Sequence, residues 1–194
     1  MRIMGFSASP RKKGNTAWTV ERILEGAEEN GAKTKIWYSG DLEIKPCKGC
    51  NACQKKDHGC SIKDDMQKLY KEIKKSDAIV LGSPVYMGQM SAQAKLFTDR
   101  LYALYAAASS KSAKDKTAKK KLVLVFTQGD PDESLYREYF EHTKKGFQIL
   151  DFDVQSVHFV ADTDKEPAKD RKGLKAEMNE IGAALALKTK TDEE

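Results

Sequence analysis

All four cysteines of the 194-residue chain lie in one lysine-rich stretch, CKGCNACQKKDHGC, spaced C-x2-C-x2-C-x6-C. They are Cys47, Cys50, Cys53 and Cys60. Thiolate sulfur is a soft ligand that suits iron–sulfur clusters and zinc. The first three thiols have a spacing that lets one short turn present three ligands to one cluster. Zinc binding, a redox-active dithiol or disulfide, and unliganded thiols stay open as alternatives, because spacing alone does not separate them.

A second stretch, SASPRKKGNT, offers groups that bind phosphate. It follows the first apolar run and precedes a helical pattern, so its backbone N–H groups and the helix dipole would face an anion. Its candidate ligands are Ser7, Ser9, Arg11, Asn15 and Thr16. The stretch matches neither the P-loop nor the dinucleotide fingerprint, which favours a single phosphate. The alternative is that these side chains only cap the helix.

A third stretch, SPVYMGQM, suits a flat ring. Pro84 and Gly88 fix a backbone that a ring can approach closely, with Val85 between them in the chain. Tyr86 and Met87 supply soft apolar surface. We therefore expect a ring-binding loop at this point.

The elements that position these stretches follow from apolar periodicity. The pattern predicts strands over residues 1–6, 33–38, 78–82, 121–126 and 154–160. Helical stripes cover residues 20–27, 66–73, 94–108, 134–146 and 174–185. Alternation of this kind predicts an α/β fold, a parallel sheet with helices on both faces, in a single domain. Ligands then bind beyond the carboxyl ends of the strands.

Composition narrows the function classes. The net charge is +5, and six lysines fall in the lysine-rich segment 111–121, which could attract nucleic acid or an acidic protein. No nucleic-acid motif accompanies it, so we expect no nucleic-acid partner. No apolar run is long enough to span a membrane and no signal peptide is evident, so we expect a cytoplasmic protein. No Ser/His/Asp constellation or paired-carboxylate motif supports hydrolysis, and we assign no catalytic residue.

Taken together, SASPRKKGNT and SPVYMG resemble the flavodoxin-like NADPH-dependent FMN reductases, and specifically the iron–sulfur flavoproteins of anaerobic archaea and bacteria. The resemblance covers residues 1–100 most clearly. It implies a flavodoxin-like doubly wound, five-stranded sheet of order 2-1-3-4-5, with FMN at the switch point. The domain would span residues 1–188, with a cysteine-rich loop at 46–62, a lysine-rich loop at 109–121 and a frayed tail at 189–194.

The resemblance also implies roles for individual residues. Ser7, Ser9, Arg11, Asn15 and Thr16 would hold the FMN phosphate, and Pro84, Val85, Tyr86, Met87 and Gly88 would line the ribityl chain and ring. Thr127, Gln128 and Gly129 would form a third flavin loop. The four cysteines, Cys47, Cys50, Cys53 and Cys60, would ligate a [4Fe–4S] cluster.

The expected activity is that of an FMN-dependent oxidoreductase. Ferredoxin or NAD(P)H would donate electrons, a small molecule would accept them, and the protein would form a homodimer or homotetramer. Three alternatives stay open: an NAD(P)H-dependent FMN or quinone reductase without a cluster, a flavodoxin-like electron carrier, and a zinc-stabilised interaction protein.

Overall fold

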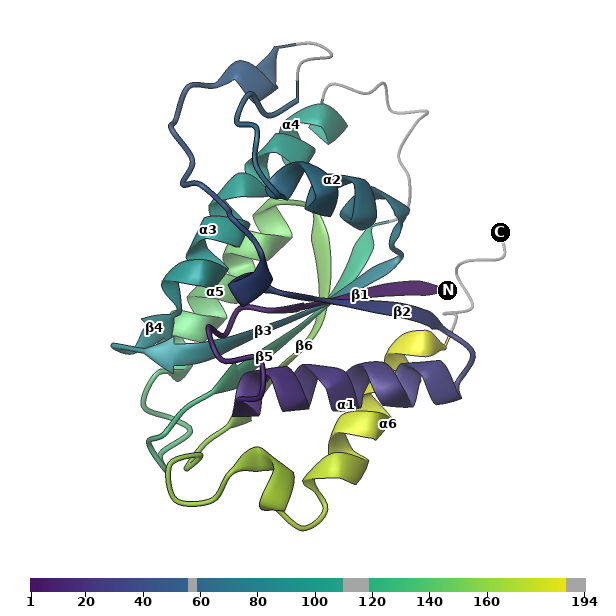
Figure 1. Ribbon diagram of the computed structural model, residues 1–194, viewed down its shortest axis with the longest axis vertical. Coiled ribbons are helices and arrows are strands. Elements are labelled where there is room, and N and C mark those ends of the chain that lie inside the picture. The colour runs from purple at the N-terminus through teal and green to yellow at the C-terminus, as the bar shows by residue number, and fades with distance from the viewer. Residues whose placement is uncertain (56–58, 110–118, 188–194) are drawn as a thin grey trace.

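The computed structural model describes residues 1–55, 59–109 and 119–187 (Figure 1). Its strands are β1 (Arg2–Ser7), β2 (Lys33–Tyr38), β3 (Ala78–Tyr86), β4 (Gln89–Met90), β5 (Lys120–Thr127) and β6 (Phe152–Val160). Its α-helices are α1 (Asn15–Glu29), α2 (Met66–Lys75), α3 (Ala92–Arg100), α4 (Tyr102–Ser109), α5 (Arg137–Ile149) and α6 (Leu174–Ala186). Short 3-10 helices include η1 (Ser39–Asp41), η2 (Ala52–Gln54) and η4 (Ala168–Asp170).

The main sheet has the order β2-β1-β3-β5-β6, and every neighbouring pair in it is parallel. This is the predicted order of five parallel strands. The sequence did not predict β4, a two-residue strand that pairs antiparallel with the end of β3. Parallel strands need crossover connections, and the helices supply them.

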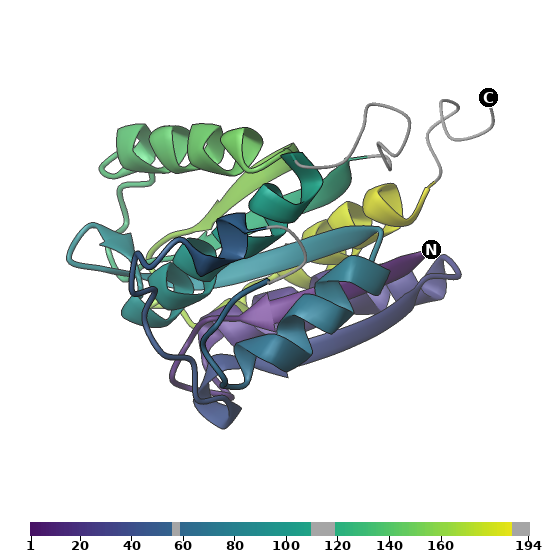
Figure 2. The same ribbon diagram turned by 90° about the horizontal axis from the view of Figure 1, so that it is seen from above.

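Helices cover both faces of the sheet, and each face has its own core (Figure 1, Figure 2). Helices α1 and α6 pack on one face, where Ile3 and Val80 meet Val20 and Met178. Helices α2, α3 and α5 cover the other face. Residues buried there include Phe6, Leu69, Phe97 and Phe140. Alternate residues of β1 and β3 therefore point into different cores, as the pleat of a strand requires.

Two predicted helices differ from those observed. The helix expected over 94–108 is divided at Leu101, where i to i+3 backbone hydrogen bonds tighten the chain on both sides. Helix α5 begins at Arg137, three residues later than the predicted start at residue 134. Much of the lysine-rich segment, residues 110–118, lies outside the described residues. None of the helices in the described ranges is long and apolar enough to cross a membrane.

Candidate functional site

The loop between β1 and α1 folds back on itself in a way that exposes a helix N-terminus. The N–H of Ala8 bonds the carbonyl of Gly82 at 2.8 Å, and Ser9 Oγ accepts the N–H of Arg11 at 3.1 Å. Gly14 occupies the N-cap of α1 and, within the described chain, no side chain caps the helix there. The first turn of α1 therefore keeps unsatisfied N–H groups that an anion can accept. The capping alternative is not supported by this geometry.

The predicted phosphate residues divide into free and engaged groups. Ser7 Oγ is buried and has no hydrogen-bond partner among the described residues. Arg11 is exposed, whereas Asn15 uses its amide oxygen to accept the N–H of Ala168 at 3.0 Å. Thr16 Oγ1 lies 2.6 Å from Thr127 Oγ1 in a buried contact. A buried hydroxyl without a partner costs free energy, so Ser7 fits a site whose ligand supplies the missing hydrogen bond.

The predicted ring loop is the turn of a β-hairpin. Val85 pairs with Met90 and Tyr86 with Gln89, which leaves Met87 and Gly88 as the two turn residues. Their φ angles are 51° and 75°, the pattern of a type I′ turn. Tyr86 is 41% exposed and Met87 is 99% exposed. This turn holds two apolar side chains in solvent at the carboxyl edge of β3.

The third loop leads from β5 to α5 and is hydrogen-bonded to the end of β6 and the segment after it. Gln128 donates from its N–H to the Val160 carbonyl at 3.0 Å, and its side-chain nitrogen donates to the carbonyls of Asp130 and Asp132. Its side-chain oxygen is buried and unpartnered in the part of the chain that the structure describes. Gly129 lies so close to Asp164 that a β-carbon there would come within 2.1 Å of the carboxylate. The predicted residues Thr127 and Gln128 are thus buried, not surface, groups.

Two serines that the sequence did not single out join the first two loops. Ser91 Oγ donates to the Ala8 carbonyl at 2.8 Å and accepts the N–H of Ala94 at 3.1 Å. Ser83 Oγ accepts the N–H of Ser91 at 3.0 Å. A serine at a helix N-cap is ordinary, and only the fold brings this one beside Ala8. These contacts fix the end of β1 against the start of α3.

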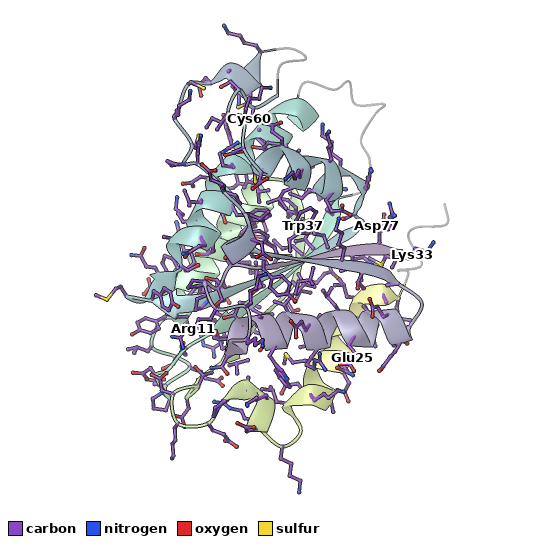
Figure 3. All side chains as sticks on the ribbon, in the orientation of Figure 1. Arg11, Glu25, Lys33, Trp37, Cys60 and Asp77 are labelled. Atoms are coloured by element: carbon purple, nitrogen blue, oxygen red, sulfur yellow. The ribbon has the colours of Figure 1, made fainter. Side chains whose placement is uncertain are left out.

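Figure 3 labels Arg11 beside the first turn of α1 and Cys60 in the loop before α2. The cysteine loop has an exposed limb and a packed limb. Cys47 and Cys50 are exposed, whereas Cys53 and Cys60 are half-buried and pack against the hydrophobic core. The 3-10 helix η2, which carries Cys53, contacts α4. All four thiols are free.

The thiols differ in acidity. A contact of 3.5 Å with Ser61 Oγ lowers the pKa of Cys50. Burial raises the pKa of Cys53, and the nearby thiols of Cys60 and Cys47 add to that rise.

The described residues nevertheless contain no group of three or more His, Cys, Asp or Glu side chains already arranged to hold a metal ion. The four thiols fit an iron–sulfur cluster in chemical type and number. In the described structure they are not yet gathered into one ligand set.

A buried ion pair lies at the base of the cysteine loop. Arg100 Nη1 donates to Asp64 Oδ2 at 2.6 Å, and each side chain is 1% exposed. Burial opposes charge on Asp64, yet the hydrogen bonds from Arg100 and from the N–H of Lys45 lower its pKa. Asp64 also accepts the N–H of Met66 at 3.1 Å, but its closer partner is Arg100.

Comparison with known proteins decides the family. The sequence profile of the NADPH-dependent FMN reductases matches residues 1–161. The chain belongs to this family. An iron-sulfur flavoprotein of Methanocaldococcus jannaschii is 44% identical over 100 residues, 52% of this chain and 51% of that protein. An iron-sulfur flavoprotein of Methanosarcina thermophila is 41% identical over 100 residues, which cover 52% of each chain. The chain thus aligns with about half the length of these relatives.

Solved structures agree on the fold of this FMN reductase family member. An NAD(P)H:quinone oxidoreductase from Methanothermobacter marburgensis superposes with a TM-score of 0.72 over 97% of this chain and 98% of that one. The two sequences are 15% identical, so the likeness concerns the fold alone. It supports the doubly wound sheet with helices on both faces.

Proposed function

We propose that this FMN reductase family member is an FMN-dependent oxidoreductase that passes electrons between FMN and a [4Fe–4S] cluster. One observation carries the flavin part. Three loops meet at the carboxyl edge of the sheet and leave two buried polar atoms, Ser7 Oγ and Gln128 Oε1, unpartnered within the described residues. A bound ligand with donors and acceptors would satisfy both atoms.

The loops have distinct tasks in this proposal. Ser7, Ser9, Arg11, Asn15 and Thr16 would hold the phosphate, with the uncapped N-terminus of α1 behind them. Pro84, Val85, Tyr86, Met87 and Gly88 would line the ribityl chain and ring, and Thr127, Gln128 and Gly129 would close the far side. The contact between Thr16 and Thr127 holds the phosphate loop and the third loop together. FMN supplies one-electron and two-electron chemistry when bound, and the chain supplies orientation and exclusion of water.

The names of the curated relatives and the four thiols support a cluster as the second redox centre. Cys47, Cys50, Cys53 and Cys60 would be its ligands. A cluster carries one electron at a time, so the pair would connect a one-electron donor such as ferredoxin to a two-electron acceptor. NAD(P)H is the other candidate donor, and a small molecule is the acceptor.

Charge at the cysteine loop supports an acidic protein donor. Lys45, Lys48 and Lys63 line a pocket of about 400 Å³ beside the cysteines, together with Pro46, Ser61 and Ile62. Cationic side chains next to a redox centre steer an acidic carrier toward it, and salt screens that attraction. The rate of reduction by ferredoxin should therefore fall as ionic strength rises. A rate that is independent of salt would contradict this docking mode.

The test of the proposed function is anaerobic purification followed by FMN, iron, acid-labile sulfide and zinc analysis of one sample. We expect one FMN and about four irons with matching sulfide per chain. Absence of FMN refutes the proposal. A Cys53→Ala variant should lose iron and keep FMN, because Cys53 lies in η2 against α4 whereas the proposed flavin loops lie at the carboxyl edge of the sheet.

A cluster-free NAD(P)H-dependent FMN or quinone reductase is the second candidate. The observation that favours it is that the described thiols are not gathered into a metal-binding group. FMN without iron or sulfide, even after anaerobic reconstitution, would support this candidate. NAD(P)H turnover with a quinone would then distinguish it from a flavodoxin-like carrier.

A further inference from the structure

The Asp64–Arg100 pair connects the two ends of the cysteine loop. Arg100 reaches Asp64 through two hydrogen bonds, Nη1 to Oδ2 at 2.6 Å and Nη2 to Oδ1 at 3.1 Å. Arg100 Nη1 also donates to the carbonyl of Lys45 at 2.8 Å. Asp64 Oδ2 accepts the N–H of Lys45 at 2.9 Å. Both backbone groups of Lys45, two residues before Cys47, are therefore held by this one ion pair.

The end of the cysteine loop that carries Cys60 is held close to the same pair. Gln67 Nε2 donates to the carbonyl of Ile62 at 2.6 Å and to that of Cys60 at 3.2 Å. Tyr70 donates from its hydroxyl to the carbonyl of Arg100 at 2.8 Å. Helix α2 thus fixes Cys60 on one side and the backbone of Arg100 on the other.

A buried ion pair usually adds little net stability to a fold. The free energy lost by removing two charges from water is about as large as that gained from their attraction, and apolar replacements of similar size are often equally stable. What the pair provides here is specific geometry. A guanidinium fork and a carboxylate fix both hydrogen-bonding groups of Lys45, which apolar side chains cannot do. Closing a loop also lowers the entropy of the chain, and the hydrogen bonds of the pair offset this loss without any metal.

We infer that Asp64 and Arg100 are positioning residues for the four-cysteine centre. They close the base of the loop before metal arrives, so that Cys47 and Cys60 start from a fixed frame. The inference rests on the proposed function, because it assumes that the four thiols bind metal.

The decisive variant replaces the whole pair by apolar residues, Asp64→Leu with Arg100→Met. It removes both contacts to Lys45 without leaving a buried charge unpaired, so we expect its melting temperature to match that of the wild type. The probe is Co²⁺, titrated into reduced, anaerobic apoprotein and followed by thiolate-to-cobalt absorption. We expect Co²⁺ affinity to fall about tenfold or more, as it does when groups that orient metal ligands are removed.

Two further variants control this result. Asp65→Asn changes the neighbouring carboxylate, which accepts the N–H of Glu43 and pairs with Lys68. Among the described residues Asp65 does not bond Arg100, so this variant should leave Co²⁺ affinity unchanged. Arg100→Lys keeps the charge without the fork, so its affinity should lie between those of the wild type and the double variant. Wild-type Co²⁺ affinity in a folded double variant would overturn the inference. Failure of the wild type itself to bind Co²⁺ or assemble iron and sulfide would instead refute the cluster part of the proposed function.

Discussion

Met87 occupies a backbone conformation that its side chain does not favour. Its φ of 51° lies in the left-handed region, which costs an L-residue other than glycine about 1–2 kcal/mol. The side chain is 99% exposed, so packing offsets none of this cost in the protein alone. Asparagine tolerates this region and is the preferred partner of glycine in a type I′ turn. We therefore expect Met87→Asn to raise the free energy of unfolding by roughly 1 kcal/mol and the melting temperature by about 2–4 °C.

The same substitution should weaken flavin binding. Full burial of a methionine side chain stabilises by about 1.5–3 kcal/mol, so covering half of it with the ring contributes roughly 1 kcal/mol. Loss of that contact corresponds to about fivefold weaker FMN binding. Quenching of FMN fluorescence measures the affinity, and thermal unfolding of the apoprotein measures the stability.

Ile149→Asn is the matched control. Ile149 is 71% exposed at the end of α5, just before the amino end of β6. It therefore lies away from the carboxyl ends of the strands, where the proposed flavin loops are. This change should leave FMN affinity unaltered. A less stable Met87→Asn protein would refute the strain argument, and an unchanged FMN affinity would refute the placement of Met87 against the ring.

Two further predictions concern packing and charge. Gly182→Ala should lower the free energy of unfolding in urea by several kcal/mol, because the new β-carbon would come within 1.8 Å of the Ile23 carbonyl oxygen. At Gly146 a β-carbon meets nothing within 4 Å, so Gly146→Ala should stabilise α5 by roughly 0.5–1 kcal/mol. Equal effects of the two substitutions would show that α1 and α6 are not in close contact. Asp64→Asn should cost about 3–5 kcal/mol near neutral pH by leaving Arg100 unpaired. The pKa of Asp64 is lowered from its ordinary 3.8 in the folded protein, so the ionised carboxylate stabilises the fold fully above that pH and loses this effect as pH falls through the folded pKa. The difference in urea midpoint between wild type and Asp64→Asn should therefore become smaller in acid. A difference that stays constant with pH would contradict an ionised Asp64 paired with Arg100.

The sheet was predictable because its strands are short apolar runs and its helices carry regular stripes. Residues 78–82 are buried on both faces, as their continuous apolar sequence indicates. The hairpin of β3 and β4 was not predictable in the same way. Its turn contains Met87 at positive φ, where residue preferences favour asparagine or aspartate. Local preference and tertiary structure disagree there, at a loop that is a candidate for ligand binding.

The cysteine loop shows a different limit. Spacing identified the four thiols as one donor set, but it could not show that Cys53 and Cys60 pack on the core while Cys47 and Cys50 stay exposed. The Asp64–Arg100 pair was missed because its partners are 36 residues apart and have no local signature. One signal was available. Arg100 follows Phe97 by three residues on an apolar helix face, where a charged side chain needs a partner.

Different contacts hold the two candidate centres, and this makes them separable. Hydroxyl contacts at the carboxyl edge of the sheet hold the loops proposed to bind flavin, as the short Thr16–Thr127 distance illustrates. An ion pair between the start of α2 and the end of α3 holds the cysteine loop. Substitutions at Asp64 and Arg100 should therefore change metal loading without changing FMN affinity, because independent contacts add in free energy when they share no partner.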